Sequence, residues 1–154
     1  MTSSNTSREK VNPFPGLRSF TPEESNLFFG RKIESDLLLS KLIQNRFIAV
    51  IGASGSGKSS LITCGLLPGI NKLSLSGSPS WNVFYMTPGK DPYESMAEEF
   101  IKKSKAADSD KSLRNEILAL LKINSDGIIN SLDNLQVNRK ENVLIIIDQL
   151  EVFG

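Results

Sequence analysis

The sequence predicts an α/β fold in layers, with helices covering a parallel sheet. Strand-like apolar runs alternate with helical patterns along the chain, which is the order expected when right-handed crossovers join parallel strands. The run Val143–Ile147 is continuously apolar, as expected of a strand that is covered on both faces. A glycine-rich segment, Gly52–Ser59, separates the apolar run Phe47–Ile51 from a helical pattern that starts at Ser60, and strand-to-helix turns of this kind belong to such folds.

The composition indicates a soluble globular protein. The chain has 154 residues, 23% of them charged, and a formal net charge of +1, so no strong field favours nucleic acid or an anionic membrane. It has no histidine, the commonest proton shuttle, and one cysteine, Cys64, which we interpret as a packing residue. No apolar run is long enough for a membrane span, and the polar residues 1–12 lack a signal-peptide core. We therefore predict a cytoplasmic protein.

Two helices are predicted before the glycine-rich segment. Thr21, followed by proline and then by Glu24 at the third position, is typical of a capped helix start. A second helix is predicted over Arg31–Gln44. Its apolar face is expected to comprise Ile33, Leu37, Leu38 and Leu42.

The helix after the glycine-rich segment is expected to end at Gly65–Pro68, because proline cannot continue a helix. Residues 71–80 are rich in serine and glycine and are expected to form a loop. A second strand is predicted over Val83–Met86, where a following Pro-Gly pair stops it. Three helices and two strands are thus predicted before residue 90.

Three helical patterns separate the second strand from the third. The first is expected to begin at the capping residue Asp91 and to run to about Lys105. A polar break over residues 106–111 follows. Apolar spacing then predicts helices around residues 113–121 and 128–135, before the strand Val143–Ile147.

The segment Gly52–Ser59 reads GASGSGKS and fits the pattern G-x-x-x-x-G-K-[ST] of a phosphate-binding loop. At a strand-to-helix turn, successive backbone N–H groups point to one position, where the positive end of the helix favours an anion. Lys58 can reach the β- and γ-phosphates of a nucleotide, and the Ser59 hydroxyl can ligate Mg²⁺. The predicted nucleotide contacts in this loop are Gly52, Ser54, Gly55, Ser56, Gly57, Lys58, Ser59 and Ser60.

A second part of the same site is predicted at Asp148, directly after the third strand. Ligands in open α/β sheets bind beyond the carboxyl ends of the strands, so Asp148 would hold Mg²⁺, directly or through a water, opposite Ser59. Glu151 could orient or deprotonate the attacking water, or it could be a solvated glutamate at a helix start. We predict Lys58, Asp148 and Glu151 as catalytic residues, and Ser59 and Asp148 as metal ligands.

Several ordered motifs make the chain similar to a known family. They are NPFPGLRSF at residues 12–20, FFGR at 28–31 with Glu34, the loop in its setting at 50–61, GLLP at 65–68, and IDQLE at 147–151. In these motifs the chain resembles the STAND NTPases, the signal-transduction ATPases with numerous domains. Among them it is similar to the bacterial novel STAND group, which is often fused to WD-repeat propellers or other repeats.

The resemblance implies a P-loop NTPase core of three α/β/α layers with a parallel sheet, and ATP with Mg²⁺ as its ligands. Gly30 and Arg31 look like the G-R-x-x-E box that lies against the adenine in this family; alternatively, Arg31 and Glu34 make only a local ion pair. We expect residues 1–12 to be a disordered leader, 13–45 a helical segment that carries this box, and 46–154 a partial core.

The chain also departs from the family pattern. Gln149 stands where many relatives carry a second acidic residue, which leaves the identity of the catalytic base open. The family's core continues past the strand that bears the aspartate, and a later strand lies between that strand and the loop strand. We therefore expect this chain to be the N-terminal piece of a parent with C-terminal repeat or effector domains, and the parent to form ATP-dependent homo-oligomers.

The resemblance implies a signalling switch that binds ATP or ADP and, in the intact parent, hydrolyses ATP. The chain has no guanine-reading N-K-x-D motif, which favours ATP over GTP. Two alternatives stay open, a P-loop kinase or other phosphotransferase, and a non-enzymatic fragment that acts only in binding or interaction. We expect the piece given by this sequence to be weakly active or inactive by itself.

Overall fold

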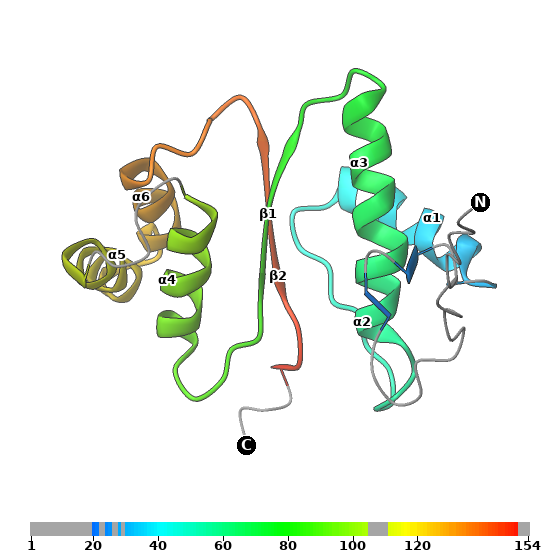
Figure 1. Cartoon of the computed structure of the whole chain (residues 1–154), viewed down its shortest axis with the longest axis horizontal. Helices are drawn as coiled ribbons and strands as arrows, with labels where there is room; N and C mark the ends of the chain where they lie inside the picture. The colour runs from blue at the N-terminus through cyan, green and yellow to red at the C-terminus, as the bar shows by residue number, and fades with distance from the viewer. Residues whose placement is uncertain (1–19, 22–23, 26–27, 29, 105–110, 151–154) are drawn as a thin grey trace, which may run out of the picture. The chain divides into compact units, whose positions relative to one another are not determined.

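The structure of the chain, a computed structural model (Figure 1), describes residues 20–21, 24–25, 28, 30–104 and 111–150. The predicted leader, the motif residues 12–19, Phe29, Glu151 and the predicted polar break up to residue 110 lie outside the described residues, as does Lys105. In chain order the elements are α1 (Lys32–Gln44), α2 (Lys58–Ser60), the π-helical turn η2 (Leu61–Leu66), α3 (Leu67–Leu75), β1 (Trp81–Met86), α4 (Pro92–Lys103), α5 (Lys111–Ile123), α6 (Gly127–Asn134) and β2 (Asn142–Ile147). This combination of helices and strands agrees with the predicted α/β class.

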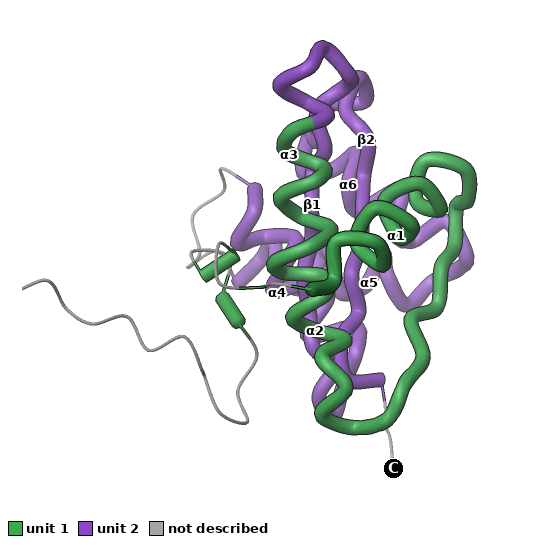
Figure 2. The backbone as a smooth tube through the Cα atoms, turned by 90° about the vertical axis from the view of Figure 1, so that its right-hand side faces the viewer, with its two compact units in different colours: residues 1–72 green, residues 73–154 purple. Residues whose placement is uncertain are grey.

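The chain divides into two compact units, residues 1–72 and 73–154, which Figure 2 colours separately. The first contains α1, α2, η2 and most of α3, and the second contains the strands and α4 to α6. The predicted domain bounds after residues 12 and 45 stay predictions. In the part of the chain that the structure describes, no helix combines the length and the apolar composition that a bilayer crossing needs.

Helix α1 lies against η2 in the first unit, through a face with two very close approaches. A Cβ built on Gly65 would overlap the Ser35 hydroxyl, and a Cβ built on Gly69 would come within 3.0 Å of a Leu39 methyl group. Leu38 of α1 is also buried. The absence of a side chain at Gly65 in η2 and at Gly69 in α3 (Leu67–Leu75) therefore lets α1 come close to both segments.

The predicted apolar face of α1 is partly wrong. Leu38 is buried as predicted, but Ile33 is 82% exposed and Leu37 is 55% exposed. The observed face has the spacing i, i+3, i+4, i+7 from Ser35, and the close approach to Gly65 favours this face because only a small side chain fits at position 35. The buried and half-buried residues of this face are Ser35, Leu38, Leu39 and Leu42.

Gly65→Ala tests this close approach. Alanine gains about 1 kcal/mol over glycine in helix propensity, but overpacking typically costs roughly 1–3 kcal/mol. The Ser35 hydroxyl is also held by its hydrogen bond to the Arg31 carbonyl, at 2.8 Å. We expect a net loss of about 1 kcal/mol in the free energy of unfolding, measured by urea denaturation. The double variant Ser35→Ala/Gly65→Ala should lose less than the single variant; an equal or larger loss would contradict the overlap.

One helical run extends from Lys58 to Leu75 through α2, η2 and α3, so the prediction that it ends at Gly65–Pro68 is wrong. The loop predicted from residue 71 begins only after Leu75. In η2 the Leu67 N–H donates to the carbonyl of Ile62, five residues back. The π-helical turn is wider than an α-helical one. It ends at Leu66, two residues before Pro68, where an α-helical turn would meet the proline ring and lack an N–H donor.

The strand predicted over Phe47–Ile51 is not formed. Phe47 is 85% exposed and Ile51 is 92% exposed, and none of these five residues makes a backbone hydrogen bond to another described residue. A strand exists only through its partner, so an apolar, strand-like sequence does not form one where no ladder is available.

The second unit contains a parallel pair of strands. Strands β1 and β2 pair from Trp81 opposite Asn142 to Met86 opposite Ile147. The Asp148 N–H extends this ladder with a hydrogen bond of 2.9 Å to the carbonyl of Met86. The strands predicted over 83–86 and 143–147, and their parallel direction, are confirmed.

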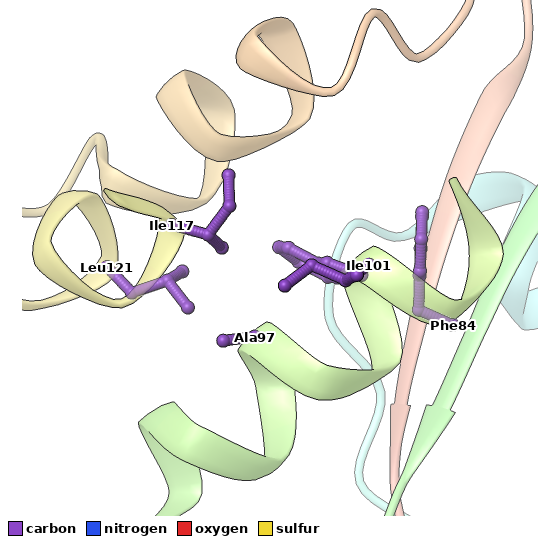
Figure 3. Packing of buried hydrophobic residues seen from close by; sticks show 6 residues of the cluster. Phe84, Ala97, Ile101, Ile117 and Leu121 are labelled. Atoms are coloured by element: carbon purple, nitrogen blue, oxygen red, sulfur yellow. The ribbon is translucent and has the colours of Figure 1, made fainter. Parts of the chain in front are cut away.

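The core of the second unit lies between β1 and the helices that follow it (Figure 3). The rings of Phe84 and Phe100 make an edge-to-face contact with centroids 4.8 Å apart, a preferred arrangement for aromatic pairs. Helices α5 and α6 confirm the two apolar patterns predicted around residues 113–121 and 128–135. The buried cluster comprises Phe84, Ala97, Phe100, Ile101, Ile117 and Leu121.

Helix α4 begins with the predicted cap. The Asp91 carboxylate accepts hydrogen bonds from the backbone N–H groups of Tyr93 (2.9 Å) and Glu94 (3.2 Å), and Pro92 occupies the first turn. The Glu94 hydrogen bond lowers the pKa of Asp91, with further lowering by Lys122 and Tyr93. The start of α4 is therefore fixed by local chemistry that the sequence alone displays.

Candidate functional site

The predicted phosphate-binding loop closes on its own lysine. The Lys58 ammonium donates to the carbonyl oxygens of Gly52 (2.9 Å) and Ala53 (3.1 Å). A turn bond of 3.2 Å from the Ser56 N–H to the Ala53 carbonyl braces the middle of the loop. The ammonium thus links the start of the loop to the start of the helix. Its positive charge lies against the carbonyl groups of the loop backbone.

All three glycines of the loop have physical reasons to be glycine. Gly57 precedes the helix with φ +80°, a left-handed conformation that other residues rarely adopt; Gly55 has φ +74° as well. A Cβ on Gly52 would lie only 2.9 Å from the Ser56 hydroxyl oxygen. A larger residue at this position would therefore crowd the Ser56 side chain on the far side of the loop.

The first helical N–H groups after the loop are available to a ligand. The Leu61 N–H donates to the Gly57 carbonyl at 2.8 Å, which leaves the N–H groups of Lys58, Ser59 and Ser60 without an acceptor among the described residues. The Ser59 hydroxyl likewise has no hydrogen-bond partner among them. With the lysine charge beside them, these donors can bind an anion.

Arg31 connects the predicted adenine-side box to the loop. Its guanidinium donates to the Ser56 carbonyl at 2.8 Å and contacts the Glu34 carboxylate at 3.2 Å. The local ion pair, which the sequence left open as an alternative, is therefore present. Gly30 directly before it has φ +84°. Contact of Gly30 and Arg31 with adenine stays a prediction.

Side chains of the first helical turns also hold the segment upstream. The Ser60 hydroxyl accepts a hydrogen bond from the Phe20 N–H at 3.1 Å, and the Thr63 hydroxyl lies 2.9 Å from the Phe20 carbonyl. The Cys64 thiol contacts the Thr21 carbonyl at 3.2 Å, which agrees with a structural role for this buried cysteine. The side chain of Ser60 is thus engaged in the fold, and its predicted contact with a nucleotide stays a prediction.

The helix start predicted at Thr21 shows part of its capping box. The Glu24 carboxylate accepts a hydrogen bond of 2.9 Å from the Thr21 N–H, as the capping box requires. Two sets of hydrogen bonds therefore hold Phe20 and Thr21. One lies within their own turn, and the other joins them to the helix that follows the loop.

Asp148 lies at the carboxyl end of β2, in the second unit, and is 8% exposed. Its Oδ2 accepts a hydrogen bond of 2.5 Å from the Tyr85 hydroxyl, and its Oδ1 accepts one of 3.0 Å from the Gln149 N–H. Gln149 has φ +61°, a left-handed conformation that is uncommon outside glycine and that concentrates at functional sites. Both oxygens of the buried carboxylate are thus oriented by a partner.

The predicted site residues fall in both units. Gly30, Arg31 and the loop residues belong to the first, and Asp148 belongs to the second. Their approach across the units stays a prediction, and Glu151 lies outside the described residues. Within those residues no group of three or more carboxylates or cysteines gathers as a metal site; the predicted magnesium site, with one carboxylate and one hydroxyl, is of a different kind.

Tyr85 is the site residue that sequence reasoning missed. Its position in the middle of the run WNVFYM gives no sign of chemistry, because a tyrosine in a strand is ordinarily a packing residue. Only the alternation of the strand carries a signal: Tyr85 must lie on the opposite face from Phe84 and the core. Which residue it meets there depends on the register between β1 and β2.

One comparison with known proteins gives a match. The family model described as Novel STAND NTPase 1 matches residues 13–153. No curated protein and no solved structure gives a match.

Proposed function

Because the chain belongs to the novel STAND NTPase family, we propose that it is the nucleotide-binding module of a Mg²⁺-dependent ATP switch. In the intact parent, ATP would hold a signalling state and hydrolysis would relax it. The observation that carries this proposal is the closed loop, in which the Lys58 ammonium lies on the carbonyls of Gly52 and Ala53. The P-loop core of three α/β/α layers is part of the same proposal.

The residues of the loop fit a triphosphate. A phosphate needs several donors and a positive charge at one position, and the loop offers the N–H groups of Lys58, Ser59 and Ser60 beside the Lys58 ammonium. On binding, the ammonium would exchange its two carbonyl acceptors for phosphate oxygens. That exchange replaces neutral acceptors by charged ones, which make stronger hydrogen bonds.

Arg31 would keep the loop in shape while this exchange takes place. Its hydrogen bond to the Ser56 carbonyl does not involve Lys58, so the loop loses only the lysine contacts when phosphate enters. The Glu34 carboxylate holds the guanidinium from the other side. In this proposal the adenine-side box holds the loop backbone through the hydrogen bond of Arg31, and it also lies next to the adenine.

The donor set also fits a magnesium ion. Mg²⁺ prefers oxygen ligands and keeps several waters, and the chain offers the Asp148 carboxylate and the Ser59 hydroxyl, which has no hydrogen-bond partner within the described part of the chain. When bound, the ion would neutralise charge on the β- and γ-phosphates. Asp148 and Ser59 would orient it, and Glu151 would be the group that orients or deprotonates the attacking water.

The partners follow from the same proposal. ATP and ADP would be the ligands, and C-terminal repeat or effector domains of the parent would read the bound state. ATP-dependent self-association of the parent and a cytoplasmic location belong to the proposal as well.

A nucleotide-dependent melt tests the function. A ligand that binds only the folded protein at 100 times its Kd stabilises it by about 2.7 kcal/mol. We expect the melting temperature of the purified protein to rise with ATP plus Mg²⁺ and with ADP plus Mg²⁺. It should rise less with GTP, and not at all with adenosine, which lacks phosphates. Equal melting curves with and without saturating ATP plus Mg²⁺ would overturn the proposal.

A further inference from the structure

The Tyr85 hydroxyl makes the shortest described contact to the predicted metal-binding carboxylate. It lies 2.5 Å from the Asp148 Oδ2, and the two residues are 63 positions apart in the chain. Tyr85 pairs with Ile146 across the two strands, so Asp148, two residues further, lies diagonally opposite on the same face. Diagonal neighbours in a sheet are within reach of aromatic side chains.

This face of the sheet is the one opposite the core of the second unit. Phe84 and Ile145 are paired and belong to the core cluster, and side chains alternate between faces along a strand. The tyrosine hydroxyl is therefore directed to the same face as the carboxylate, and away from the cluster around Phe100. Packing of the core does not require the hydroxyl group.

The contact restricts what the Asp148 carboxylate can do. The Tyr85 O–H occupies one lone pair of Oδ2, and the Gln149 N–H occupies one lone pair of Oδ1. Each carboxylate oxygen keeps a further acceptor position, and the two hydrogen bonds fix the plane of the carboxylate. A carboxylate that is held by such partners loses less rotational freedom when it binds a metal ion or a metal-bound water.

We infer that Tyr85 is a positioning residue for Asp148, which fixes the carboxylate for the metal ion that accompanies the nucleotide. The inference rests on the proposed function. It states that the hydroxyl of Tyr85 acts on the Mg²⁺-dependent part of nucleotide affinity and leaves the Mg²⁺-independent part unchanged. The strand register supplies this partner, because Tyr85 lies in β1 and Asp148 directly follows β2, where its N–H continues the ladder to the Met86 carbonyl.

The test compares Tyr85→Phe with Tyr93→Phe, which replaces the only other tyrosine in the chain. Tyr93 lies on α4, is 47% exposed, and has the Lys122 ammonium over its ring at 5.8 Å, a contact that phenylalanine retains. ATP is titrated calorimetrically into each purified protein, once with Mg²⁺ and once with EDTA. Loss of an outer partner of a metal ligand typically costs 10- to 100-fold, so Tyr85→Phe should weaken the Mg²⁺-dependent gain by roughly 10-fold.

Three outcomes separate this inference from the proposed function. Affinity in EDTA should be the same for wild type, Tyr85→Phe and Tyr93→Phe, and Tyr85→Phe should have no further effect in an Asp148→Asn background. If Tyr85→Phe keeps the full Mg²⁺-dependent gain, or lowers only the melting temperature, the inference is overturned and the proposed function stands. If the wild-type protein binds no ATP, the proposed function fails and the inference fails with it.

Discussion

Replacing Lys58 by alanine should reduce the affinity for ATP plus Mg²⁺ by about 100-fold or more. Hydrogen bonds to charged groups contribute roughly 1.5–3 kcal/mol each, and each 1.4 kcal/mol is a factor of ten in affinity. The ammonium would donate to two phosphate groups, and no other described lysine contacts the loop carbonyls. Calorimetric titration of ATP into the purified variant measures the loss.

The variant also tests the closed loop itself. Without the ammonium, the carbonyls of Gly52 and Ala53 lose their donor, but both residues are exposed and water can replace it. The melting temperature of the nucleotide-free protein should therefore change little. Lys41→Ala, at an exposed position of α1, is the matched control and should bind as wild type does. Equal ATP affinity for Lys58→Ala and Lys41→Ala would contradict the predicted role of Lys58.

Replacing Asp148 by asparagine should remove most of the Mg²⁺ dependence of ATP binding. The substitution keeps the size of the side chain and an acceptor for the Tyr85 hydroxyl, but it removes the charge that a hard cation requires. Loss of the ligand itself should exceed the roughly 10-fold effect expected for its partner. Affinity with EDTA present should stay near that of the wild type, since the loop retains its lysine and N–H donors.

Asp126→Asn provides a control for the charge change. Asp126 precedes α6 in the same unit, is exposed, and makes no side-chain cap hydrogen bond. Its replacement should leave the Mg²⁺ dependence unchanged, measured by titration at a series of Mg²⁺ concentrations. An Asp148→Asn protein with the same Mg²⁺ dependence as Asp126→Asn would rule out a metal role for Asp148.

Local features of the structure could be predicted because few residues decide them. The cap of α4 needs only an acceptor at Asp91 and the N–H groups that follow it. The capping contact of Thr21 and Glu24 likewise lies within three residues. The strand β2 was predictable from its own apolar run. The cover on both faces that such a run favours is not seen among the described residues, where Val143 and Ile147 are each 39% exposed.

Wrong predictions arose where a rule for short sequence patterns did not decide the outcome. The helix after the loop passes Pro68 because a π-helical turn precedes it, and proline rules assume an α-helical turn. The apolar spacing of α1 fits two faces, and the contact of Ser35 with Gly65 selects between them. The run Phe47–Ile51 has the composition of a strand but joins no ladder among the residues that the structure describes.

The candidate site also combines features that a short segment determines with contacts that only the tertiary structure supplies. The loop motif singled out Lys58 and the glycines around it from the sequence alone, and the structure shows the lysine on carbonyls of its own loop and positive φ at Gly55 and Gly57. Arg31 reaches Ser56 from 25 residues away, and Tyr85 reaches Asp148 from 63 residues away. Neither contact has a local signature.

The sequence by itself determined the features that short segments carry: a loop with the pattern of a phosphate-binding loop, a capped α4, and an apolar strand followed directly by Asp148. The tertiary structure alone decided which residues meet these groups. Residues distant in the sequence become neighbours only through strand register and helix phase, and a shift of one residue turns a side chain to the opposite face of a sheet. Tyr85 contacts Asp148 for that reason, and no pattern within either strand specifies the pair.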